Sequence, residues 1–185
     1  SRYKSSPDTK ALFSCLRRQK GPRAFVFAHI GGRFANVNTH DPATEIAVEV
    51  HSAWGTFEWL VQDALSRGYR VGICANSDGH KGRPGASYPG AAKFGSYGGL
   101  TCLLADKLDR ESIVDALFRR HFYATTGNRM LIDLELTTTS GAKAVIGDVI
   151  KVKEEEVKLT VSVGGAGPIE RVDVFNGSKV VKTFS

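Results

Sequence analysis

The spacing of hydrophobic positions divides the chain into two parts that meet near residue 130. In the first part, short apolar runs predict buried strands, and apolar residues three and four apart predict amphipathic helices. The runs lie at residues 24–29, 45–52, 69–78 and 99–105, and the helical segments lie at 8–19, 56–67 and 109–120. Asp8 and Asp109 stand before two of these helices as expected N-caps. Strands that alternate with helices predict an α/β class with a mostly parallel sheet.

The second part of the chain, residues 130–185, has a different period. Its segments LIDLELT, EVKLTVSV and IERVDVFN alternate apolar and polar residues, and turn sequences such as GGAGP and NGS separate them. This pattern predicts a small antiparallel, Ig-like β unit that follows a β/α domain of residues 1–129.

Composition and charge narrow the classes of function. The 185 residues carry a net charge of +6 without a basic helix face, which favours an anionic small-molecule partner and argues against nucleic acid. No apolar run approaches the ~20 residues of a membrane span, and the first residues contain no signal-peptide core. We therefore expect a soluble chain of open localisation and oligomeric state. The three cysteines are widely spaced, which is typical of free thiols.

Residues of the kinds that bind metals stand at the ends of three predicted strands. His29 ends the first, Glu49 and His51 end the second, and the motif Asp78-Gly79-His80 ends the third. In an extended strand, residues two apart point to the same side, so Asp78 and His80 are expected to face one cleft. Their nitrogen and oxygen ligands suit a divalent Zn, Mn or Fe ion. Taken singly, His29 could instead be a core histidine, and Glu49 could cap a helix or pair with an arginine.

Other polar residues near this motif have two interpretations each. Lys81 and Arg83 could bind a substrate anion, or they could be solvated loop charges. The loop 82–99 is rich in glycine, and we expect its aromatic residues to wall the pocket. His40 is expected at the surface, and His121 is expected to have a structural role at a helix end.

The segments AFVFAHIGG, AVEVHSAWG, ANSDGHKGRPG and ALFRRHFYATTG, in this order, resemble the polymerase and histidinol phosphatase (PHP) superfamily, in its DUF3604 branch. The resemblance implies a metal-dependent phosphoesterase on a distorted (β/α)7 barrel with up to three divalent ions. It implies that His29, Asp78 and His80 are metal ligands. It makes Glu49, His51 and Glu58 candidate catalytic or supporting residues, although the family usually has another residue type at His51.

One departure from the family limits these expectations. The HxH motif of the first barrel strand does not occur in this sequence. We therefore expect the chain to be the C-terminal portion of a longer hydrolase that uses metal-activated water, and to be inactive alone. Two alternatives stay open: a degenerate module that binds a ligand or partner without catalysis, and a metal-dependent amide or ester hydrolase.

Overall fold

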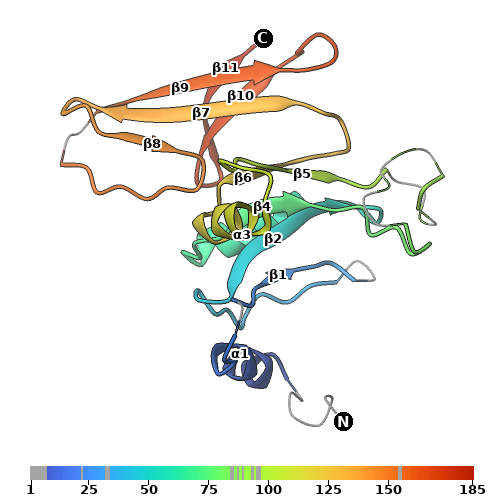
Figure 1. The fold of residues 1–185 in the computed structure, drawn as a ribbon. Helices are drawn as coiled ribbons and strands as arrows, with labels where there is room; N and C mark the ends of the chain where they lie inside the picture. Colours follow the sequence, from blue (N-terminus) through green and yellow to red (C-terminus); the bar gives the residue numbers. More distant parts are fainter. Residues whose placement is uncertain are drawn as a thin grey trace.

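A computed structural model gives the arrangement of the chain (Figure 1) and describes residues 8–21, 23–31, 34–83, 86, 88, 90–92, 94, 97–153 and 156–185. The helices and strands follow one another in the order α1 (Thr9–Arg17), β1 (Val26–Ala28), β2 (Glu45–Ser52), β3 (Gly55–Thr56), α2 (Glu58–Ser66), β4 (Gly72–Ala75), β5 (Leu100–Leu103), α3 (Arg110–Arg119), β6 (Phe122–Thr125), β7 (Leu131–Thr138), β8 (Lys143–Val145), β9 (Val157–Gly164), β10 (Val172–Asn176) and β11 (Lys179–Phe184).

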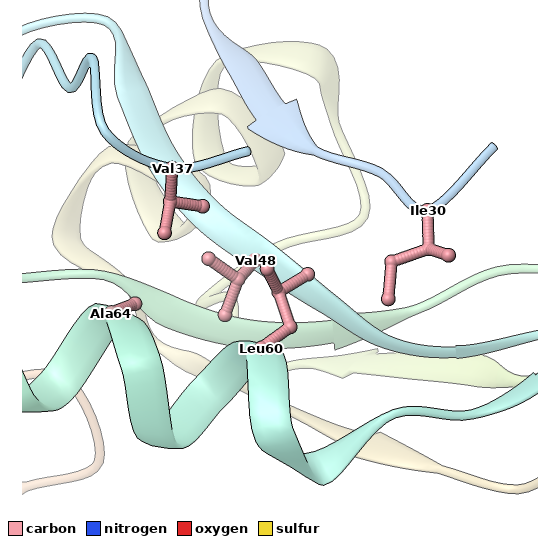
Figure 2. Close-up of a cluster of buried hydrophobic side chains, with 5 residues drawn as sticks. All are labelled: Ile30, Val37, Val48, Leu60 and Ala64. Carbon is pink, nitrogen blue, oxygen red and sulfur yellow. The ribbon is translucent and has the colours of Figure 1, made fainter. Parts of the chain in front are cut away.

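The strand β2 is the centre of the first sheet. It pairs in parallel with β1 on one side and with β4 on the other, and β3 folds back antiparallel at its end. Seven of its eight residues are buried, polar ones included. The helix α2 connects β2 to β4 and places Leu60 and Ala64 against Val48, with Ile30 and Val37 completing the cluster (Figure 2). This buried cluster fixes the sheet edge where the candidate site lies.

Two of the predicted helix starts are confirmed by their caps. The Asp8 carboxylate accepts a hydrogen bond from the amide of Ala11, and the Asp109 carboxylate accepts one from the amide of Ser112, each at 2.8 Å. Such caps satisfy amides that have no partner within the helix. The helix α3 ends at Arg120, whose φ of 65° turns the chain out of the helix.

The predicted fold class, an α/β fold with part of a (β/α)7 barrel, is wrong. Among the described strands, parallel pairing is confined to β1, β2 and β4. The strand β5 pairs with β6 antiparallel, although α3 lies between them in sequence. The described residues form three short helices and mostly small antiparallel sheets, and they contain no (β/α) barrel. A barrel needs each strand to be followed by a helix that returns the chain for the next parallel strand. Here the connection from α3 enters β6 in the opposite direction to β5.

The strands after residue 130 pair antiparallel, as their alternation predicts. One sheet has the order β8-β7-β9, and β10 and β11 form a hairpin (Figure 1). No helix is found in the described residues beyond 130. The proposed domain boundary between residues 129 and 130 stays a prediction. Among the helices described, none has the length and apolar character that crossing a membrane requires.

Candidate functional site

Four of the five residues predicted at the strand ends, all except His51, meet at one edge of the first sheet. The parallel register of β1 and β2 carries His29 level with Glu49, and His29 Nδ1 contacts Glu49 Oε2. The segment after β4 brings Asp78 to the same edge, with Asp78 Oδ2 3.9 Å from His29 Nε2. From the same segment, His80 Nε2 lies 2.7 Å from Asp78 Oδ1. We call these four residues the strand-end cluster.

Burial divides the strand-end cluster into a floor of carboxylates and a rim of imidazoles. The side chains of Glu49 and Asp78 are 4% and 13% exposed, whereas those of His29 and His80 are 39% and 48% exposed. Water screens buried charges poorly, so two carboxylates in the floor attract a cation more strongly than two on the surface. The exposed rim gives such a cation a route from solvent.

One oxygen in the floor has no hydrogen-bond partner among the described residues. Asp78 Oδ2 is buried and accepts no hydrogen bond from the described residues, because His29 Nε2 at 3.9 Å is beyond hydrogen-bonding range. A buried acceptor without a donor costs about 1–3 kcal/mol, and a charged one costs more. The Asp78 carboxylate therefore has one oxygen that could accept a further donor or contact a cation.

The cluster fits a metal ion only in part. The gap between Asp78 Oδ2 and His29 Nε2 is just under twice the usual zinc-to-ligand distance of about 2.0–2.2 Å, so one ion could contact both atoms. The Glu49 carboxylate contacts Nδ1 of His29, and metal-binding histidines usually have such a carboxylate or carbonyl partner that orients the ring. Nevertheless, among the described residues no group of three or more His, Cys, Asp or Glu side chains is arranged to hold an ion. His80 faces the other oxygen of Asp78, so the cluster offers two converging ligand atoms.

The predicted conformation of the Asp78-Gly79-His80 motif is wrong. The sequence predicts an extended segment, but β4 ends at Ala75, and the motif lies in an irregular segment that bends at His80. Asp78 and His80 have φ values of 42° and 45°, a left-handed conformation that non-glycine residues adopt rarely. This conformation, rather than the alternation of a strand, makes their side chains meet. Strained backbone of this kind is commonly found at functional sites.

Glu49 has a second partner that the sequence analysis missed. Asn76, directly after β4, donates from Nδ2 to Glu49 Oε1 at 2.7 Å. Its position between a buried strand and the Asp78 motif was the only signal in the sequence. Nearby, Cys74 is a buried free thiol, and burial, followed by the charge of Glu49, raises its pKa to about 12. Cys74 therefore stays protonated and is no nucleophile at neutral pH.

Two candidate catalytic residues, His51 and Glu58, do not join the strand-end cluster. His51 is buried, with Nδ1 2.7 Å from Thr56 Oγ1 and Nε2 2.8 Å from the carbonyl of Tyr97. Both of its nitrogens are occupied in joining β2 to β3 and to the end of the long loop. Glu58 is exposed in the first turn of α2, where a negative charge favours the helix dipole. Their catalytic roles stay predictions.

The remaining histidines have partners outside the strand-end cluster. The prediction of His40 at the surface is wrong: its side chain is 7% exposed, stacks on Tyr69 with ring centroids 4.1 Å apart, and contacts Glu45 Oε2 at 2.6 Å. The loop folds back over the sheet, which a polar stretch of sequence does not reveal. His121 Nε2 lies 2.8 Å from Asp148 Oδ1, a contact that joins the first part of the chain to the second.

The predicted substrate-binding cations brace the loop that follows the motif. Lys81 Nζ donates to the carbonyl of Gly90 at 2.9 Å, and Arg83 donates to the Tyr88 hydroxyl at 3.0 Å. Both side chains stay exposed, so substrate binding by either stays a prediction.

Aromatic rings join this loop to the cluster. Phe94 stacks on Trp54 with ring centroids 4.1 Å apart and meets His80 edge to face at 4.8 Å. Phe94 therefore lies on the His80 side of the cluster, and the expectation that the aromatic residues of the loop wall a pocket stays a prediction. Pro84 and Pro89 of this loop lie outside the described residues.

Comparisons with known proteins identify similar proteins, but the names of these proteins state no reaction. The family described as "Protein of unknown function (DUF3604)" matches residues 86–138, which begin after the strand-end cluster. An uncharacterized protein of Chlamydia pneumoniae is 26% identical over 164 residues, covering 77% of this chain and 26% of that protein. An uncharacterized protein of Chlamydia trachomatis serovar D is 23% identical over 170 residues, covering 80% and 27%.

The chain thus spans about a quarter of the length of these curated relatives. No solved structure matches it. None of these findings links the chain to the PHP superfamily that its motifs resemble.

Proposed function

We propose that the strand-end cluster is part of a divalent-cation site in a metal-dependent phosphoester hydrolase, to which this chain contributes one portion. The observation that supports this most directly is the buried, unpartnered Oδ2 of Asp78, which faces His29 Nε2 across 3.9 Å. With His29 neutral and its proton on Nδ1, the lone pairs of Nε2 and Oδ2 would face each other and repel. A cation between them would replace that repulsion with two favourable contacts.

Each residue of the cluster then has a distinct task. His29 and Asp78 would hold the cation, and Glu49 would accept a hydrogen bond from the Nδ1–H of His29, which leaves the Nε2 lone pair toward the site. A bound cation of this kind lowers the pKa of a coordinated water and offsets the charge of a phosphoryl group. His80 could supply a further ligand once its contact with Asp78 Oδ1 is released.

The phosphoester class rests on two further supports. The motifs around His29 and Asp78 resemble those of the PHP superfamily, whose members hydrolyse phosphoesters. Lys81 and Arg83 follow the motif directly and raise the local positive charge that attracts an anion. The names of the Chlamydia relatives say nothing about a reaction, so the substrate class needs a direct test.

One observation favours a second candidate, a module that binds a cation or anion without turnover. Only two ligand atoms converge in the described cluster, and catalysis by a bound ion needs a full set of ligands together with an open position. A metal-dependent amide or ester hydrolase would use the same cluster and is separated from a phosphoesterase only by its substrates.

Cation binding by the 185-residue chain tests the site itself. Calorimetric titration with Zn²⁺ and Mn²⁺ should show one ion bound by the wild type and none by Asp78→Ala. The control is Asp106→Ala, which removes the same charge from an exposed loop position. Equal binding by all three proteins would exclude the strand-end cluster as the site.

Turnover by the longer protein tests the reaction. A panel of aryl phosphates, phosphodiesters, amides and esters is assayed with each metal. We expect phosphoester turnover that falls by at least ~100-fold in Asp78→Ala, because that change removes a ligand and the charge that offsets the ion. Metal binding without any turnover would favour the binding module, and amide turnover would favour the third alternative.

A further inference from the structure

We propose that Asn76 is a positioning residue that acts through Glu49 to hold His29 in one tautomer, with its free nitrogen toward Asp78. The consequence for a cation rests on the function proposed above, whereas the consequence for the imidazole does not. Asn76 was not among the residues that the sequence singled out.

A chain of three polar groups carries the inference. Asn76 Nδ2 donates to Glu49 Oε1 at 2.7 Å, and the other oxygen of the same carboxylate contacts His29 Nδ1. An ionised carboxylate only accepts hydrogen bonds, so Nδ1 of His29 carries the proton in this contact. The Nε2 atom of a neutral His29 is then the unprotonated one, and it is this atom that lies 3.9 Å from Asp78 Oδ2.

The backbone of Asn76 is fixed on both sides. Its amide donates to the carbonyl of His51 at 3.1 Å, and its carbonyl accepts from the amide of Gly99 at 2.8 Å. Its side chain borders a mostly apolar hollow of about 230 Å³ that Cys74 and Thr101 also line. The side-chain amide therefore reaches Glu49 from a backbone that is held by two hydrogen bonds.

The uncharged character of Asn76 matters for His29. Glu49 is buried, so each of its oxygens needs a donor. Asn76 supplies one donor without neutralising the carboxylate, and the full negative charge remains to hold the proton on His29 Nδ1. Without Asn76, Glu49 Oε1 would lose its hydrogen-bond donor, and the carboxylate would rotate so that both of its oxygens compete for the remaining donor, His29 Nδ1. His29, which is well exposed, would then be free to exchange tautomers.

The wild-type chain gives the first test without any variant. Long-range ¹H–¹⁵N correlation spectra of the imidazole nitrogens, recorded at pH 8 with a chelator, report which nitrogen is protonated. An imidazole in water favours the Nε2–H form, so a dominant Nδ1–H form at His29 is the expected and distinctive result. Finding Nε2–H at His29 in the wild type would overturn the proposal.

Two variants test whether Asn76 is the cause. Asn76→Ala removes the donor, and Asn76→Asp keeps the shape but replaces the donor with a repelling charge. The matched control is Thr101→Val, which removes hydrogen bonds of similar length between the Thr101 hydroxyl and the backbone of Ala75 without touching Glu49. We expect a mixture of tautomers at His29 in both Asn76 variants and the wild-type spectrum in the control.

Cation affinity is measured on the same proteins to separate this proposal from the preceding one. If the site binds Zn²⁺, the affinity should fall ~10- to 100-fold in the Asn76 variants. If the wild type binds no ion but its tautomer still depends on Asn76, the positioning role stands and the proposed function fails. An unchanged tautomer in folded Asn76→Ala and Asn76→Asp would show that Asn76 has only a structural role.

Discussion

Replacing Asp78 by Asn should stabilise the metal-free chain and remove the stabilisation that a cation provides. The carboxylate oxygen Oδ2 of Asp78 is buried without a hydrogen-bond donor among the described residues and lies 3.9 Å from His29 Nε2. In Asp78→Asn, an amide N–H takes this place, and it can donate to Nε2 once the two side chains close the present 3.9 Å gap. Asparagine also tolerates the left-handed φ of 42° as well as aspartate does, so the backbone should not change.

The size of the effect follows from two opposed terms. Relieving a buried unpartnered acceptor gains about 1–3 kcal/mol. The contact of the other oxygen with His80 Nε2, 2.7 Å long, becomes a bond to a neutral acceptor and loses about 1 kcal/mol. We expect a net gain of about 1 kcal/mol in the free energy of unfolding. For a chain of this size, that corresponds to a rise in Tm of about 2–4 °C.

Thermal and urea unfolding with and without metal are the measurement. In a chelator, Asp78→Asn should melt above the wild type. At a free Zn²⁺ concentration of 100 times Kd, the wild type should gain about 2.7 kcal/mol and the variant nothing, so the order of stability reverses. Asp106→Asn, a change at an exposed position, should have no effect in either condition. A loss of stability in Asp78→Asn in the chelator would refute the argument, because it would mean that Oδ2 already has a partner.

Four further predictions follow from the structure. Phe94→Ala removes the ring that meets His80 edge to face, with ring centroids 4.8 Å apart. An aromatic contact of this kind contributes about 0.5–1.5 kcal/mol, so the cation affinity measured by calorimetry should fall ~2- to 10-fold. Unchanged affinity would contradict this prediction. The hydrogen bond from Arg17 lowers the pKa of Asp41 to about 2, below its unfolded value near 4. The ion pair should therefore stabilise fully above pH ~4 and lose its effect as the pH falls through about 2, and acid unfolding curves of Arg17→Ala should lack this component. Cys74, with its pKa raised to about 12, should be the last thiol to react with a disulfide reagent at pH 8, and rapid labelling of the folded chain would contradict its burial. The 185-residue chain alone should hydrolyse aryl phosphates negligibly with any metal, because two converging ligands are too few for catalysis; robust metal-dependent turnover would contradict this.

Features that depend on neighbouring residues could be predicted from the sequence. The caps at Asp8 and Asp109 and the buried run that became β2 are set by the local chain, and the structure confirms them. The alternation after residue 130 similarly predicted strands that pair antiparallel. The clustering of ligand-type residues at the ends of β1, β2 and β4 could also be predicted, because parallel neighbours end at the same edge.

Other features depend on how distant segments meet, and these the local pattern could not specify. The strand β6 runs antiparallel to β5, which removes the barrel, because hydrophobic period marks a strand without giving its direction. His51 turns to Thr56 and Tyr97 rather than to the cluster, and His40 is buried against Tyr69. The partners of these side chains come from segments that are distant in the sequence, so the local sequence does not predict them.

The candidate site combines both kinds of information. Its ligand types, His29 and the Asp78-Gly79-His80 motif, were determined by the sequence, since only those side chains carry the chemistry. The left-handed backbone at Asp78 and His80, the unpartnered oxygen facing His29, and the support of Glu49 by Asn76 were decided by tertiary structure. Hydrogen bonds and burial are made across strands that pair in space, so a residue acquires its charge environment only when the sheet has formed.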